Sequence, residues 1–144
     1  MCDTRRAVII VNTIQIIGGI VGAILLGVAL KAEQDGTITN EELTEFFAGW
    51  GTENTIAAYV AIGIRLLMNL TGVMGALHYS VCMVGTCFVW YVIQAIGAGI
   101  AHAWGAMVVT ILFAYVHIYF IMEVNSGIMS PQNYHNEKHS CCCV

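Results

Sequence analysis

The stretch Ile56–Met122, IAAYVAIGIRLLMNLTGVMGALHYSVCMVGTCFVWYVIQAIGAGIAHAWGAMVVTILFAYVHIYFIM, decides the fold class of this chain. It contains one formally charged residue, Arg65. Because a helix needs about 20 apolar residues to cross the hydrocarbon core of a bilayer, the stretch is long enough for three crossings. A further apolar run, Ala7–Leu30, lies upstream and predicts a fourth crossing. The sequence therefore predicts an all-α integral membrane protein.

The composition agrees with a membrane protein that forms a single domain over residues 1–144. The 144 residues are 58% hydrophobic and 10% charged, whereas a soluble domain has roughly 25% charged residues. The predicted spans cover 7–30, 55–77, 79–101 and 104–123, with an acidic loop over 31–54 and a polar tail over 124–144. The first span is longer than the apolar region of a cleavable signal peptide, so we expect it to remain as a helix. Short turns between later spans predict an antiparallel bundle.

The few cations predict the orientation of the chain in the membrane. Arg5 and Arg6 precede the first span, and Lys138 lies in the tail. The loop over 31–54 has one lysine against six acidic residues. Since cationic residues favour the cytosolic side, both termini are predicted to be cytosolic and the loop extracellular or lumenal, in the plasma membrane or an endomembrane.

Small residues in the spans predict close contact between helices. Gly18 and Gly22 form a GxxxG pair, and the other candidate packing glycines are Gly72, Gly75, Gly99 and Gly105. Small residues let helix backbones approach each other in lipid, where apolar side chains gain little from association. Packing inside one chain and packing against a neighbouring copy both remain open.

Polar residues inside the spans form a candidate intramembrane layer. A central arginine costs about 2.5–3.5 kcal/mol on insertion scales, so Arg65 should face the bundle or a watery cavity. The predicted layer consists of Asn12, Gln15, Arg65, Asn69, Gln94 and His117. No aspartate or glutamate lies at this depth, which argues against a proton or cation carrier. The layer is interpreted as hydrogen bonding that sets helix register, with an anion, lipid-headgroup or transport site as the alternative.

The outer loop has a short motif with two interpretations. Asp35–Leu43 resembles the second half of an EF-hand calcium loop, and in that register the candidate ligands are Glu33, Asp35, Thr37, Thr39 and Glu42. The first loop position is Lys31, which removes a ligand. Alternatively, Asp35-Gly36 forms a turn and Thr39–Glu42 a capping box that begins a short helix through Phe47. We prefer the turn and cap, and no calcium is expected.

The cysteines indicate lipid modification. Five of them lie on or near the predicted cytosolic face: Cys2, Cys82, Cys141, Cys142 and Cys143. The outer loop has none, so no disulfide framework is expected. Cytosolic cysteines beside a span are candidates for S-acylation, and prenylation and free thiols are the alternatives for the terminal triplet. Covalent acyl chains are the only cofactor expected, because no two histidines lie at a matching depth for haem.

The layout resembles that of small tetraspan proteins, with four spans, cytosolic ends and one larger outer loop after the first span. Tetraspanins carry their large loop after the third span, and claudins have a cysteine pair in the first loop, so neither family matches this chain. The layout is similar to that of the MARVEL group, which has no diagnostic motif. The resemblance is one of layout alone and implies a bundle of four membrane-spanning helices.

No nucleophile–base pair, paired carboxylates or phosphate loop is visible in the sequence, so no enzymatic activity is expected. We predict a structural or scaffold protein, or an assembly subunit, whose partners are the lipid bilayer and further copies or a membrane complex. A nucleic-acid partner is not expected. The alternatives are a small channel or carrier around Arg65 and a calcium-responsive membrane protein.

Overall fold

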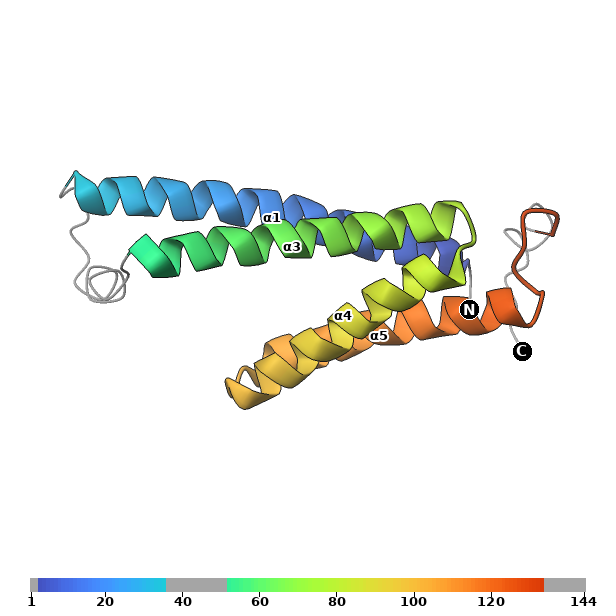
Figure 1. Cartoon of the computed structure of the whole chain (residues 1–144). Coiled ribbons are helices and arrows are strands. Elements are labelled where there is room, and N and C mark those ends of the chain that lie inside the picture. Colours follow the sequence, from blue (N-terminus) through green and yellow to red (C-terminus); the bar gives the residue numbers. More distant parts are fainter. Residues whose placement is uncertain (1–2, 36–51, 134–144) are drawn as a thin grey trace. The chain divides into compact units, whose positions relative to one another are not determined.

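The computed structural model describes residues 3–35 and 52–133, and this part of the chain is all-helical (Figure 1). Its helices are α1 (Thr4–Gln34), α3 (Thr52–Leu77), α4 (Val81–Ile100) and α5 (Trp104–Asn125). Each is long and apolar enough to cross a membrane. The prediction of an all-α chain with four candidate membrane spans is thus confirmed for the described residues. The short helix predicted to end at Phe47 lies outside them.

The helical conformation follows from the apolar sequence and the solvent it requires. A bilayer core offers no water to backbone groups, so each N–H and C=O must find a partner within the protein. A helix satisfies all of these groups except those at its ends. The connections between α3 and α4 and between α4 and α5 are three residues long, and they show how the helix ends are closed.

The connection after α3 uses one residue to end a helix and begin the next. The Ser80 N–H donates to the Gly75 carbonyl at 2.8 Å, while its hydroxyl caps α4 by accepting from the Met83 N–H at 3.5 Å. The residue before Ser80, Tyr79, adopts a left-handed backbone conformation with a φ of 54°. This is the Schellman arrangement, in which a left-handed residue lets the chain reverse onto the last helical carbonyls.

The connection after α4 repeats the same arrangement. The Ala103 N–H donates to the Ala98 carbonyl at 2.9 Å, the His102 N–H donates to the Gly99 carbonyl at 3.1 Å, and His102 has a φ of 54°. Both reversals therefore rest on a left-handed residue that is not glycine, which is uncommon for L-residues.

The chain divides into two compact units. Unit 1 comprises Met1–Ile14 and Met68–Val144, and unit 2 comprises Gln15–Leu67. Helix α1 contributes its first part to unit 1 and the remainder to unit 2, and α3 is shared in the opposite order.

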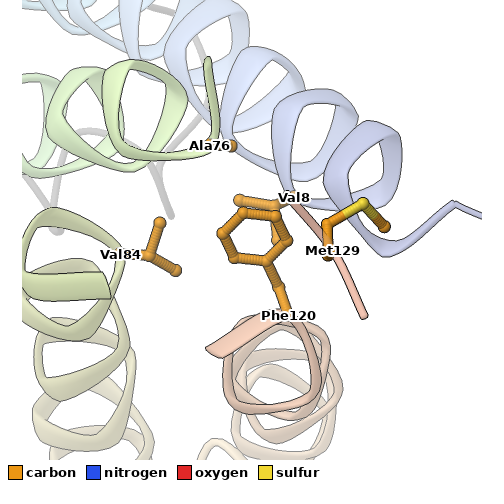
Figure 2. Close-up of a cluster of buried hydrophobic side chains, with 5 residues drawn as sticks. All are labelled: Val8, Ala76, Val84, Phe120 and Met129. Atoms are coloured by element: carbon orange, nitrogen blue, oxygen red, sulfur yellow. The ribbon is translucent and has the colours of Figure 1, made fainter. Parts of the chain in front are cut away.

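Unit 1 has an apolar core at the ends of its helices. Figure 2 shows Val8, Ala76, Val84 and Met129 gathered around the ring of Phe120, and each of these five is buried. They come from α1, α3, α4, α5 and the segment after α5. Met129 reaches this core because its N–H donates to the Glu123 carbonyl at 3.1 Å, which folds the start of the polar tail back onto the helices.

In unit 2, α1 and α3 contact each other through glycines. A Cβ atom at Gly19 would lie 2.9 Å from Leu66 Cδ2, and one at Gly27 would lie 3.0 Å from the Tyr59 hydroxyl. Large apolar side chains such as Leu25 and Leu67 remain more than 60% exposed. This exposure is what a lipid-facing helix surface requires.

Candidate functional site

A cluster of buried polar side chains lies inside unit 1, within the candidate spans. We call it the Asn12 cluster and define it as Asn12, Asn69, Cys87, Tyr91 and His117. The five come from α1, α3, α4 and α5, and none is more than 1% exposed. Buried polar groups are costly unless they are hydrogen-bonded, so the partners of each group decide what the cluster does.

Asn12 lies at the centre and uses both ends of its amide. Its Nδ2 donates to the Val8 carbonyl and contacts His117 Nε2, each at 2.8 Å. Its Oδ1 lies 3.2 Å from Cys87 Sγ and 3.2 Å from the Tyr91 hydroxyl, both potential donors. One side chain of α1 is therefore bonded to both α4 and α5.

Tyr91 extends the cluster to α3. Its hydroxyl donates to Asn69 Oδ1 at 2.6 Å, which is shorter than its contact with Asn12. Its ring lies against His117, with centroids 4.9 Å apart, and edge-on to Phe113 at 5.9 Å. Tyr91 therefore connects the polar cluster to the apolar interior between α4 and α5.

Gly72 on α3 makes room for the Asn12 side chain. A Cβ atom at position 72 would lie 2.8 Å from Cγ, Nδ2 and Oδ1 of Asn12. Since Asn12 is bonded on several sides, it has no free direction in which to move. Glycine at this position is thus a packing requirement of the cluster.

A second polar group fastens the ends of the unit 1 helices. Arg5 donates through Nε to the Ala76 carbonyl at 3.0 Å and through Nη2 to the Leu77 carbonyl at 3.3 Å, and its guanidinium lies 4.8 Å from the Tyr79 ring centroid. These carbonyls end α3 and lack partners within the helix. Thr4, which is fully buried, donates to the carboxylate of Glu123 near the end of α5.

The predicted intramembrane layer separates into three parts. Asn12, Asn69 and His117 lie together in the Asn12 cluster. Arg65 and Gln15 form a separate pair in unit 2, where Arg65 Nη2 donates to Gln15 Oε1. Gln94 is half-buried on α4 and makes no side-chain hydrogen bond to the described residues. The six residues are therefore not one continuous layer of bonds.

The predicted packing glycines also divide. Gly75 packs tightly, since a Cβ there would lie 2.8 Å from Val84 Cγ2, and Gly99 lies close to Met107. At Gly18, Gly22 and Gly105 a Cβ would meet nothing within 4 Å. Gly72 and Gly75 thus serve packing inside the chain, whereas the GxxxG pair leaves room for a Cβ atom at both positions.

The remaining predicted sites are described only in part. Cys82 is exposed in the first turn of α4. Glu33 lies near the end of α1, and Asp35 follows it and is exposed. The other predicted lipid-modified cysteines and calcium ligands lie outside the described residues: Cys2, Cys141, Cys142, Cys143, Thr37, Thr39 and Glu42. Within residues 3–35 and 52–133 there is no group of three acidic, histidine or cysteine residues that could hold a metal ion.

Sequence reasoning missed Tyr91 and Cys87 as members of the cluster. Neither residue is among the polar residues that the sequence analysis selects. Their spacing of four residues places both on one face of α4, together with Val84 and Ala95, and that periodicity was the available signal.

Comparison with known proteins gave no relative: no family model, no curated protein and no solved structure matches this chain. What the chain does must therefore be argued from its own geometry, which is that of an integral membrane protein with a bonded polar interior.

Proposed function

We propose that this chain is a non-enzymatic structural protein of the membrane, an antiparallel four-span bundle that self-associates or joins a larger membrane complex as an assembly subunit. The observation that carries the proposal is the open GxxxG pair of α1. Gly18 and Gly22 are exposed, and neither would bring a Cβ within 4 Å of another described atom.

The surroundings of the pair suit a helix–helix contact. Ile17, Val21 and Leu25 flank the glycines and are about half exposed or more. Two glycines four residues apart form a flat strip between such side chains, so that the backbone of a second helix can approach closely. A second copy of α1 offers the same strip, which makes the surface self-complementary.

Helix α4 supplies a second argument for assembly. Gln94 on this helix is half-buried and makes no side-chain hydrogen bond to the described residues. An unpaired polar group at membrane depth favours association with a helix that can bond it. Gln94 is therefore a candidate for contact with a partner subunit.

The Arg65–Gln15 pair supports the structural role over the carrier alternative. A carrier needs its intramembrane cation to face a watery pathway, whereas Arg65 is half-buried and donates to a side chain of the neighbouring helix. The pair is a bond between α1 and α3 that stabilises their packing.

The proposal includes an orientation and a lipid modification. With both termini cytosolic, Arg5 and Arg6 lie on the cytosolic side, as the positive-inside rule favours. Cys82 then lies in the cytosolic turn of α4 and, being exposed, is accessible to an acyltransferase. Acyl chains there and on the terminal cysteines would hold the ends of the chain against the bilayer.

The experiment is the particle mass in mild detergent, measured by light scattering for the wild type and for Gly18→Ile. We expect a homo-oligomer in the wild type and a smaller particle in the variant, because isoleucine holds the two helices apart. Gly63→Ile is the matched control, since Gly63 is also open but has Tyr59 and Leu67 four residues to either side. A wild-type monomer, or equal loss of mass in both variants, would contradict self-association, and flux through Arg65 in liposomes would then be tested.

A further inference from the structure

The hydrogen-bond roles in the Asn12 cluster define the protonation of His117. Its Nδ1 lies 2.7 Å from the Phe113 carbonyl, which can only accept, so Nδ1 carries a proton. Its Nε2 faces the Asn12 amide at 2.8 Å. Whether Nε2 carries a proton therefore depends on whether it faces the oxygen or the nitrogen of the Asn12 amide.

The orientation of the Asn12 amide is determined by its other neighbours. The atom that faces Nε2 also lies 2.8 Å from the Val8 carbonyl, so it must be the donor Nδ2. The opposite atom is then the acceptor Oδ1, and the thiol of Cys87, which can donate, lies 3.2 Å from it. Nε2 of His117 is consequently an acceptor without a proton, and the ring is the neutral Nδ1–H form.

A second proton on the ring would break this pattern. An Nε2–H group would face the N–H of Asn12, placing two donors against each other. Turning the amide over would relieve that contact but would place Oδ1 against the Val8 carbonyl, two acceptors facing each other, and Nδ2 against the Cys87 thiol. Neither arrangement keeps the bonds from Asn12 to α4 and α5.

No charged group in the described part of the chain is placed to stabilise an imidazolium at this position. The groups that contact the ring are Asn12 from α1, Tyr91 from α4 and the Phe113 carbonyl of α5 itself. Cys87 and Asn69 lie beyond them, bonded to Asn12 and Tyr91. The nearest carboxylate along α5 is Glu123, which is engaged by Thr4.

We propose that the Asn12 cluster is an acid-sensitive latch that joins α1 to α4 and α5 while His117 is neutral and releases when His117 takes up a proton. An imidazole that is released from the cluster has the ordinary pKa of about 6.5, so it binds a proton when the pH falls below that value. Because the open form then holds more protons than the closed form, the closed form loses stability as the pH falls below that value. The latch would respond to passage from a neutral to an acidic compartment or surface.

The test compares thermal unfolding in detergent at about pH 7.5 and about pH 5, on either side of the imidazole value. For the wild type we expect the midpoint to fall by at least about 4 °C on acidification. His117→Gln should keep its midpoint, because the glutamine Oε1 can accept from Asn12 but does not titrate. The exposed His78 and His102 serve as controls, and His78→Gln and His102→Gln should behave as the wild type.

A second measurement does not depend on a variant folding. The nitrogen NMR spectrum of histidine-labelled wild type at neutral pH should show one ring with a protonated Nδ1 and a bare Nε2, and this ring should be missing in His117→Gln. A proton on Nε2 would overturn the proposal, as would an unchanged wild-type midpoint or an equal acid-induced loss in His117→Gln. If His117→Gln does not fold, the wild-type spectrum and the two control variants decide.

Discussion

Units 1 and 2 are built from the same kind of apolar helix but use their polar residues differently. In unit 1, five neutral side chains from four helices form a hydrogen-bonded cluster around Asn12. The Asn12 side chain occupies the space beside Gly72 that a Cβ atom would need. In unit 2, Arg65 donates to Gln15, and a Cβ atom at Gly18 or Gly22 would meet no described atom within 4 Å.

The difference shows how a membrane protein can have a specific interior without a hydrophobic driving force. Apolar side chains gain little by leaving lipid for protein, so packing and hydrogen bonds decide which helix faces contact. Both units have such contacts within the chain, but unit 1 gathers its hydrogen bonds around one buried side chain, Asn12. Unit 2 in addition has two exposed glycines, Gly18 and Gly22, at which a Cβ atom would meet no described atom within 4 Å.

The largest expected effect comes from removing the centre of the cluster. Asn12→Ala leaves His117 Nε2 and Cys87 without their partner and creates a cavity beside Gly72, so we expect a loss of about 2–3 kcal/mol in the free energy of unfolding. The matched change in unit 2, Gln15→Ala, removes one bond and should cost less than about 1.5 kcal/mol. Unfolding by denaturing detergent, followed by circular dichroism, measures both. Equal losses would remove the distinction between the units.

A smaller change in the free energy of unfolding is expected from adding one methyl group at Gly72, which packs against Asn12, or at Gly22, which has space for a Cβ atom. Gly72→Ala places Cβ 2.8 Å from the Asn12 side chain and should destabilise the protein by about 1–3 kcal/mol through overpacking. Gly22→Ala meets no atom and should be neutral, or stabilising by up to about 1 kcal/mol through helix propensity. The same unfolding assay, in a detergent that keeps the chain monomeric, gives both values. Opposite signs sharpen the comparison, and a neutral Gly72→Ala would contradict it.

The smallest effect concerns the end of unit 1, where two adjacent arginines differ in their partners. Arg5→Ala removes bonds to two carbonyls at the end of α3 and the contact with Tyr79, so we expect a loss of about 1–2 kcal/mol. Arg6, whose side chain is 63% exposed, forms an ion pair with Asp3 at 2.9 Å. Its backbone N–H also donates to Asp3 and remains in the variant, so Arg6→Ala should cost less than about 1 kcal/mol. A denaturation midpoint that moves equally in both variants would show that net charge, and not the capping of α3, is responsible.

Hydropathy was sufficient to predict the four helices, because their existence depends on length and apolar content alone. The polar residues within the spans could be read from the sequence as candidates for one layer, because polar groups at one depth of a membrane need partners. Hydropathy could not show that Arg65 and Gln15 form their own pair, nor that Tyr91 and Cys87 belong to the cluster. Those assignments depend on how each helix is rotated, and a span that is apolar on every side leaves rotation undefined.

The sequence by itself determined the class of this protein, because an uninterrupted apolar run of such length has no stable arrangement in water. Only the tertiary structure decided which glycines are packed against a neighbouring side chain and which polar groups are hydrogen-bonded to each other. It also decided which ring nitrogen of His117 is placed to donate and which to accept. Those properties arise from contacts between side chains of different helices. For example, Asn12 Nδ2 on α1 is a donor, and because it faces His117 Nε2 on α5, that nitrogen acts as an acceptor. The physical reason is that the free energy of transfer into lipid is a sum over all residues of a helix and can be obtained from the sequence. A hydrogen bond between two helices depends on the positions of two atoms, which only the packed structure defines.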